Sequence, residues 1–175
     1  MVPRDGLRII QWNVDGLGTS LVDLIGLVER EPEIDVLMIQ ETKLLPTAPD
    51  PRLPGYAAIR RDRPTPTRGG SRAGGLMTFV KEDIPYRVVN AYSGDEENGT
   101  ECLAVEIRLD QGRSFTLVNT YRAPTREAGQ RPSFDHIRVP VTPLSWLVTS
   151  MLIPPCGTTL SLAIGGGSPG GVGVG

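Results

Sequence analysis

Three polar side chains of this sequence stand where predicted β-strands end. Asn13 and Glu41 each follow a short apolar run, and Tyr121 follows the second strand of a predicted hairpin. Ligand sites favour such positions. A carboxylate among carboxamide and phenol groups suits a hard cation, because Mg²⁺ prefers oxygen and usually takes one or two carboxylates together with water and a substrate phosphate. These residue types therefore make a cation-assisted reaction at phosphate the chemistry to test.

A predicted strand–helix–strand unit positions the first two of these residues. Residues 7–11 are β-branched and strand-like, and Ser20 can cap a helix over 21–29 whose apolar positions recur at helical spacing. Pro32 closes that helix. The uninterrupted apolar run at 36–39 predicts a strand buried on both faces, with Glu41 near its carboxyl end.

The later part of the chain predicts more strands, separated by a proline-rich and arginine-rich surface loop. In residues 102–109 apolar and polar side chains alternate, which indicates a half-buried strand, and Asp110–Arg113 is a hairpin turn. The predicted strands of this part cover residues 56–60, 75–80, 86–90, 102–109 and 114–120.

The end of the chain differs in composition from the rest. All 38 charged residues lie at or before Arg138. Residues 144–153 predict a second helix, and residues 159–164 predict a last strand. The glycine-rich residues 167–175 cannot bury enough apolar surface to become ordered, so we expect a domain over residues 1–166 followed by a disordered tail.

Composition limits the remaining possibilities. A length of 175 residues predicts one domain, and 21 glycines with 16 prolines favour a strand-rich fold with few helices. A net charge of −2 gives no overall attraction to nucleic acid or membrane. Cys102 and Cys156 form neither a zinc motif nor a disulfide framework. With no signal-peptide pattern and an apolar run at 144–153 too short to span a bilayer, we expect an intracellular protein, nuclear or cytoplasmic, that is not secreted and has no membrane partner.

Four motifs occur in order along the chain. They are Gln-Trp-Asn-Val-Asp-Gly-Leu at 11–17, Ile-Gln-Glu-Thr-Lys-Leu at 39–44, the pair Gly74-Gly75, and Val-Asn-Thr-Tyr-Arg-Ala-Pro at 118–124. With these motifs the sequence resembles the endonuclease/exonuclease/phosphatase superfamily over residues 7 to about 166. It looks most like the apurinic/apyrimidinic-type endonuclease domain of non-LTR retrotransposons.

The resemblance implies a fold, a reaction and partners. The implied fold is an α+β sandwich, with two layers of β-sheet flanked by helices, here incomplete at the C-terminus. The implied reaction is phosphodiester hydrolysis dependent on Mg²⁺ or Mn²⁺, which nicks target DNA so that reverse transcription can be primed. The implied partners are DNA and the reverse transcriptase domain of the full-length element.

Site roles transfer only to matching residues. Glu41 corresponds to the family's metal-binding glutamate, Asn13 to the asparagine that orients metal and phosphate, and Tyr121 to the active-site tyrosine. The alternatives are an exposed carboxylate, a turn-forming asparagine and a core aromatic side chain, respectively. Asp15 fits a turn residue better than a ligand.

A cluster of arginines forms the one basic patch in a slightly acidic chain. Guanidinium groups suit phosphate, so on a nuclease these residues would bind the DNA backbone and make binding fall with salt. A solvated loop is the alternative. The cluster consists of Arg60, Arg61, Arg63, Arg68 and Arg72.

Two motifs on which the superfamily's chemistry depends do not follow in this chain. The run Leu162–Gly166 resembles the strand before Gly-Asp-x-Asn, yet Gly167-Ser168-Pro169 comes next, and no Asp-His pair closes the sequence. The dipeptide Asp135-His136 precedes that position and is not assigned a catalytic role. Three functions stay open: a DNA-nicking hydrolase domain, a catalytically dead remnant that binds metal or nucleic acid, and a phosphatase of the same superfamily.

The abrupt change to uncharged, glycine-dominated sequence at a motif boundary is most simply explained by a frameshift or a truncated gene copy. This hypothesis predicts that another reading frame, just past the codon for Gly166, encodes Asp-x-Asn and later an Asp-His pair. Translating the downstream DNA in all three frames tests it, and the absence of both motifs would refute it.

Overall fold

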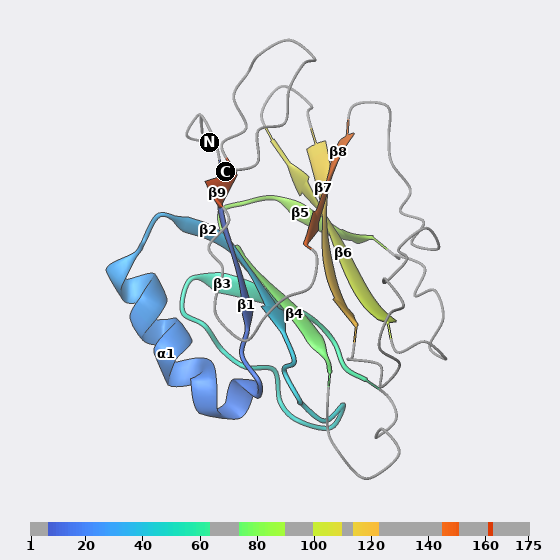
Figure 1. Cartoon of the computed structure of the whole chain (residues 1–175). Coiled ribbons are helices and arrows are strands. Elements are labelled where there is room, and N and C mark those ends of the chain that lie inside the picture. The colour runs from blue at the N-terminus through green and yellow to red at the C-terminus, as the bar shows by residue number, and fades with distance from the viewer. Residues whose placement is uncertain are drawn as a thin grey trace.

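Two β-sheets stack against each other, and a helix lies on the outer side of one of them (Figure 1). The computed structural model describes residues 7–63, 74–89, 100–109, 114–122, 145–150 and 161–162. The expected fold class, a two-layered β-sandwich with flanking helix, is confirmed. Within these ranges a single helix flanks the sheets.

The first sheet contains the predicted strand–helix–strand unit. Strands β1 and β2 are parallel and are joined by the helix α1, Leu17–Arg30, while β4 pairs antiparallel with both β2 and β3. The strand order is β3–β4–β2–β1–β9. The bounds are β1 Leu7–Asn13, β2 Ile34–Gln40, β3 Tyr56–Arg61, β4 Leu76–Lys81 and β9 Ser161–Leu162.

The second sheet has the order β5–β6–β7–β8. Its strands are β5 Tyr86–Val89, β6 Thr100–Arg108, β7 Ser114–Arg122 and β8 Ser145–Ser150. Strands β6 and β7 pair antiparallel, as the predicted hairpin requires. Tyr121 therefore lies within β7 and not beyond its end.

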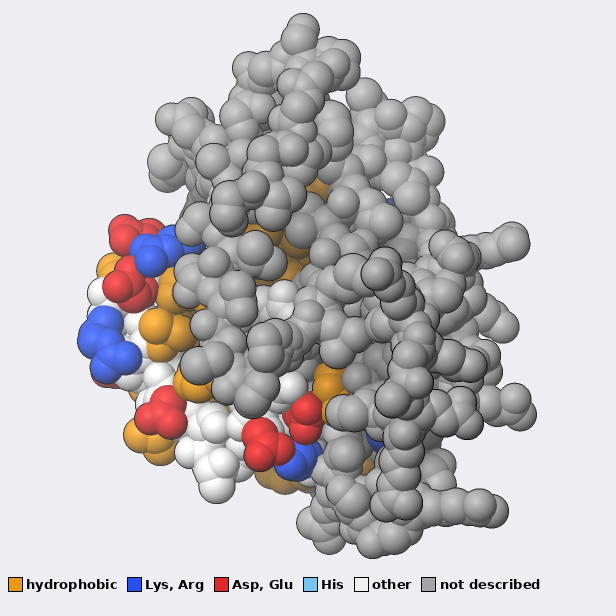
Figure 2. Space-filling view, in the orientation of Figure 1, with side chains coloured by type: hydrophobic (Ala, Val, Ile, Leu, Met, Phe, Trp, Pro, Cys, Tyr) orange, Lys and Arg blue, Asp and Glu red, His pale blue; other side chains and the backbone are white. Residues whose placement is uncertain are grey.

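Strand β2 is buried on both faces, which confirms the prediction from its uninterrupted apolar run. Val36 and Met38 belong to the cluster between the sheets, together with apolar side chains of β6 and β7. Leu37 and Ile39 belong to the cluster under α1. The helix contributes its buried side chains Leu17, Leu24 and Val28 to that second cluster. The charged side chains of α1, Asp23, Glu29 and Arg30, are exposed. Figure 2 shows acidic and basic side chains on the surface at the helix side of the molecule.

Helix α1 begins at Leu17, before the predicted cap Ser20, and that cap prediction is wrong. Gly16 holds the N-cap position with a φ of 122°, and within the described residues no side chain caps the helix. The first amides bond to a neighbouring backbone instead: those of Gly16 and Leu17 donate to the carbonyls of Glu41 and Thr42 at 2.9 and 3.0 Å. These bonds anchor the start of the helix to the segment that follows β2.

The predicted helix at 144–153 is also wrong, because part of this run forms β8, which pairs in parallel with β7. A short apolar run does not distinguish helix from strand, and this one contains aromatic and β-branched residues that favour a strand. The strand expected at 159–164 is present as β9, antiparallel to β1. The tail at 167–175 lies outside the described residues. No helix in the described ranges is long and apolar enough to cross a lipid bilayer.

A buried amide joins the two sheets. Asn119 of β7 is 1% exposed, and its Nδ2 donates to the carbonyls of Ile39 on β2 and Met77 on β4, at 3.0 and 3.1 Å. The Gln40 side chain reaches back from β2, and its Nε2 donates to the Thr120 carbonyl at 2.7 Å. These bonds cross the apolar core and therefore fix how the sheets are placed against each other.

We expect Asn119→Leu to lower the free energy of unfolding by about 3 kcal/mol, because two buried carbonyls lose their shared donor. Urea unfolding followed by tryptophan fluorescence measures this.

Thr78→Val is the matched control, since it also removes a buried polar group. The Thr78 hydroxyl has no hydrogen-bond partner within the described part of the chain. Its removal should leave stability unchanged or raise it. Equal losses in both variants would contradict the structural role of the Asn119 amide.

Candidate active site

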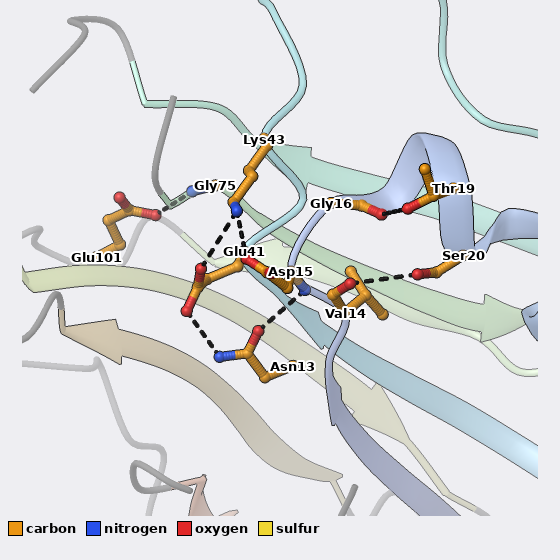
Figure 3. Close-up of polar contacts among 10 residues, drawn as sticks. All are labelled: Asn13, Val14, Asp15, Gly16, Thr19, Ser20, Glu41, Lys43, Gly75 and Glu101. Carbon is orange, nitrogen blue, oxygen red and sulfur yellow. Dashed lines mark hydrogen bonds and ion pairs between the residues drawn. The ribbon is translucent and has the colours of Figure 1, made fainter. Parts of the chain in front are cut away.

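The three candidate side chains come together although they belong to different strands. Asn13 ends β1, Glu41 follows β2 directly, and Tyr121 lies on β7 of the other sheet. The Asn13 amide donates from Nδ2 to Glu41 Oε1 at 2.8 Å (Figure 3). The Tyr121 hydroxyl is also hydrogen-bonded to Glu41. The strand–helix–strand unit predicted from the sequence thus brings Asn13 and Glu41 together, while their role at a metal stays a prediction.

The pairing of β1 with β2 explains why Asn13 meets Glu41. The strands are parallel, and their register places Asn13 beside Gln40. Both strands therefore finish at the same edge of the sheet, and the next residue, Glu41, emerges next to Asn13. Carboxyl ends of adjacent parallel strands are a common place for ligand sites.

The backbone around Glu41 is strained. Glu41 and Lys43 both have a φ of 53°, and Asp15 has a φ of 47°. Left-handed conformations cost a non-glycine residue on the order of 1–3 kcal/mol and persist only where surrounding contacts enforce them. Such strain concentrates at functional sites.

Two other backbone segments enforce that conformation. On one side, the Glu41 carbonyl accepts from the Gly16 amide at 2.9 Å. On the other side, the amides of Thr42 and Lys43 donate to the carbonyls of Gly75 and Gly74, at 3.1 and 2.9 Å. The residue that carries the candidate carboxylate is thus held from both sides.

Lys43 brings a positive charge that was not assigned from the sequence. Its ammonium forms an ion pair with Asp15 and lies 4.0 Å from Glu41 Oε2 (Figure 3). The hydrogen bond from Lys43 holds the pKa of the exposed Asp15 carboxyl below its usual value. The pair is largely exposed and contributes little to stability. The signal that could have found Lys43 is its place in the Gln-Glu-Thr-Lys motif.

Tyr121 is buried beside Glu41. Burial raises the pKa of its hydroxyl first, and the negative charge of Glu41 together with the hydrogen bond to it raises the pKa further. The hydroxyl therefore keeps its proton at neutral pH and can donate it in a hydrogen bond. Its burial also fits a core aromatic side chain, so the two interpretations made from the sequence describe one residue.

A model of the endonuclease/exonuclease/phosphatase family matches residues 10–164. The chain belongs to this family. Enzymes of the family are generally dependent on a divalent metal, and the matched segment contains Asn13, Glu41 and Tyr121.

The chain is also similar to individual proteins. The chain is 36% identical over 80 residues to a probable RNA-directed DNA polymerase from transposon X-element of Drosophila melanogaster, a match that covers 46% of this chain and 8% of that protein. It is similar in structure to the AP endonuclease LMAP from Leishmania major, with a TM-score of 0.52 and 26% identity over 69% of this chain and 41% of that one. The Xenopus laevis APE2 catalytic domain gives a TM-score of 0.46 and 19% identity, over 66% of this chain and 45% of that one. The chain thus spans less than half the length of each of these proteins.

Gln40 and Asn119 lie beside the candidate site but were not predicted as site residues. Each lies next to or near a candidate, Gln40 before Glu41 and Asn119 two positions before Tyr121. Both are buried, and together they connect the ends of β2 and β7. The sequence signal that could have identified these two residues is a carboxamide side chain at an inward position of an otherwise apolar strand.

The arginines predicted to bind DNA have partners within the chain. Arg60 is ion-paired with Asp62 at 2.6 Å, Arg61 donates to the Cys102 carbonyl at 2.8 Å, and Arg63 is ion-paired with a carboxylate of β6 at 2.5 Å. The others, Arg68 and Arg72, lie outside the described residues, as does the dipeptide Asp135-His136. Binding of DNA by this cluster stays a prediction.

The donor set suits the divalent metal that the family uses. Within the described residues no group of three or more His, Cys, Asp or Glu side chains could hold a metal by itself. Glu41 instead offers Oε2, because its Oε1 accepts from Asn13. One fixed carboxylate among hydroxyl and amide oxygens fits Mg²⁺ or Mn²⁺ completed by water and phosphate, and fits a softer metal poorly.

The raised pKa of Tyr121 makes the free energy of unfolding depend on pH in the alkaline range. The folded state raises the pKa of the Tyr121 hydroxyl above its unfolded value of about 10. The stability that the protonated hydroxyl contributes is therefore fully present below a pH of about 10 and is lost as the pH rises through the folded-state pKa, because the unfolded chain gives up its proton first. We expect the free energy of unfolding to fall above about pH 10, and to fall less steeply in Tyr121→Phe and in Glu41→Gln. Urea unfolding over a pH series measures the slopes.

The control for these slopes is Glu33→Gln, an exposed carboxylate elsewhere on the first sheet's side of the molecule. It should keep the wild-type slope. A wild-type slope in Glu41→Gln would mean that Glu41 does not act on Tyr121.

Proposed function

We propose that this chain derives from the DNA endonuclease domain of a non-LTR retrotransposon protein. In this role the domain nicks target DNA, and a reverse transcriptase domain of the full-length protein then extends the nicked end. The observation that carries the proposal is that Asn13 and Tyr121 both contact the carboxylate of Glu41. The likeness to a transposon polymerase and to an AP endonuclease supports DNA as the substrate.

Each residue of the site has a chemical task in this proposal. Glu41 would bind Mg²⁺ or Mn²⁺ through Oε2, and the bound metal would neutralise charge on the phosphate. Asn13 fixes Oε1 of the carboxylate, so that Oε2 keeps one direction. Tyr121 keeps its proton and can donate a hydrogen bond to a phosphate oxygen. Lys43 lies close enough to add positive charge on the same side.

The 175 residues supply this cation-binding part without the later motifs. Neither Gly-Asp-x-Asn nor a closing Asp-His pair occurs in them, so no identified group activates water or stabilises the leaving oxygen. Loss of one member of a catalytic constellation costs roughly 10² to 10⁴ in rate, and groups that act together lose most of the activity with the first deletion. This favours binding of metal and nucleic acid over efficient cleavage. A phosphatase activity has no specific observation in its favour.

We expect the purified 175-residue chain to bind Mn²⁺, and Glu41→Ala to bind it at least about tenfold more weakly, because the one fixed carboxylate is removed. Isothermal titration measures this. We also expect wild type to nick supercoiled plasmid in Mg²⁺ no faster than Glu41→Ala.

Glu33→Gln is again the control and should bind Mn²⁺ as wild type does. If Glu41→Ala binds Mn²⁺ unchanged, the proposed cation site is wrong. If wild type nicks plasmid in a manner that depends on Glu41, the later motifs are less necessary than we infer.

A further inference from the structure

A second carboxylate, Glu101 on β6, lies buried close to the site. It is 8% exposed and lies directly across from Tyr121 in the pairing of β6 with β7. One oxygen, Oε1, is ion-paired with Arg63 Nε at 2.5 Å, and the other, Oε2, accepts from the Gly75 amide at 2.6 Å. Figure 3 shows Glu101 turned toward Gly75, with Glu41 and Lys43 beyond Gly75 as seen from Glu101.

The contact of Glu101 with the backbone requires glycine. Gly74 and Gly75 have φ values of 93° and 85°, which residues with a side chain rarely adopt. A Cβ on Gly74 would collide with Glu101 Oε1, and a Cβ on Gly75 would collide with the Thr42 hydroxyl. The glycine pair thus allows both the Glu101 carboxylate and Thr42 to approach the same stretch of backbone.

That stretch of backbone is the one that holds Glu41 in place. The carbonyls of Gly75 and Gly74 accept from the amides of Thr42 and Lys43, at 3.1 and 2.9 Å. A continuous series of bonds therefore runs from Arg63 through Glu101 and the glycine pair to the residues that directly follow Glu41. It links the second sheet to the conformation of a residue on the first.

Stability alone does not account for this buried ion pair. Burial raises the pKa of Glu101 despite the nearby arginines, so its charge is not favoured overall where it lies. Buried pairs of this kind are often no more stabilising than apolar side chains of similar volume. The neighbouring Glu106 on the same strand is different, because a hydrogen bond from Ser114 and its pairing with Arg87 hold the pKa of Glu106 below the usual value.

We propose that Glu101 is a positioning residue for the cation site: its carboxylate, oriented by Arg63, fixes the Gly74-Gly75 backbone, and this backbone fixes the Glu41 carboxylate. The effect on metal binding rests on the proposed function, whereas the effect on the backbone does not. Glu101 does not itself bind the metal, since both of its oxygens have partners.

The test compares Glu101→Gln with Glu106→Gln. A carboxamide has one acceptor oxygen, so Glu101→Gln loses either the contact with Arg63 or the hydrogen bond from the Gly75 amide while keeping the shape of the side chain. Glu106 is a matched control, because it is equally exposed at 8%, lies on the same strand and is paired with an arginine, at 2.5 Å. Gly74→Ala is a second variant, which displaces the carboxylate and leaves Glu101 in the sequence.

Two measurements are made on each variant. Hydrogen exchange by NMR should show the Thr42 and Lys43 amides exchanging about tenfold faster in Glu101→Gln and Gly74→Ala, and unchanged in Glu106→Gln. Isothermal titration should show Mn²⁺ binding about tenfold weaker in the first two variants and unchanged in the control.

The outcomes separate this inference from the proposed function. Wild-type exchange at Thr42 and Lys43 in Glu101→Gln overturns the inference whatever the metal data show. Faster exchange with Mn²⁺ binding that Glu41→Ala leaves unchanged supports the positioning role and refutes the proposed cation site. A third outcome is that the amides exchange faster in Glu101→Gln and Mn²⁺ binding is weakened by Glu41→Ala but not by Glu101→Gln. This outcome overturns the inference and leaves the proposed function intact. An equal effect of Glu106→Gln also overturns it, because the loss would then follow from general destabilisation.

Discussion

The path of the backbone from Gln40 to Lys43 is the constraint on which the rest of the site depends. Hydrogen bonds reach it from three directions: from the turn before α1, from the Gly74-Gly75 pair, and from β7 through the Gln40 side chain. Together they hold Glu41 in a left-handed conformation that its own side chain disfavours. The strain is local, and the bonds that enforce it come from elements far apart in the sequence. This separation is typical of a functional site, where local preference yields to the global fold.

The same segment explains features of the fold that look unrelated. Helix α1 begins where the carbonyls of Glu41 and Thr42 accept from the amides of Gly16 and Leu17, so the segment that carries Glu41 also anchors the start of the helix. The two glycines before β4 are required because the Glu101 carboxylate approaches Gly74 and the Thr42 hydroxyl approaches Gly75 too closely for a Cβ. The sheets are joined at this end by Asn119, whose amide bridges β2 and β4. The site and the joining of the two layers therefore occupy the same region of the structure.

These relations show what the sequence could and could not predict. Burial of β2 on both faces followed from its apolar run, and the meeting of Asn13 with Glu41 followed from two parallel strands that end together. The start of α1 could not be predicted from Ser20, because its amides are satisfied by a strand some 25 residues later in the chain. Residues 144–153 were misassigned because their strand character depends on pairing with β7. The partners of Arg61 and Arg63 likewise come from the tertiary fold, whereas Arg60 pairs with Asp62 two positions later, so charge alone suggested a surface patch where the structure has internal bonds.

The candidate site residues lie earlier in the chain than the position at which the resemblance implies the later motifs. This separation bears on function. Among the side chains that the structure describes, those of the apolar clusters on both faces of the first sheet come from positions 7–121, as do Asn13, Glu41 and Tyr121. The motifs that the family uses to activate water and release the leaving group would come after that point. A chain can therefore belong to the family and keep the geometry around Glu41 without containing every motif that the resemblance implies. Family membership follows from the fold and the motifs that build it, whereas activity depends on whether every reacting group is present at the site.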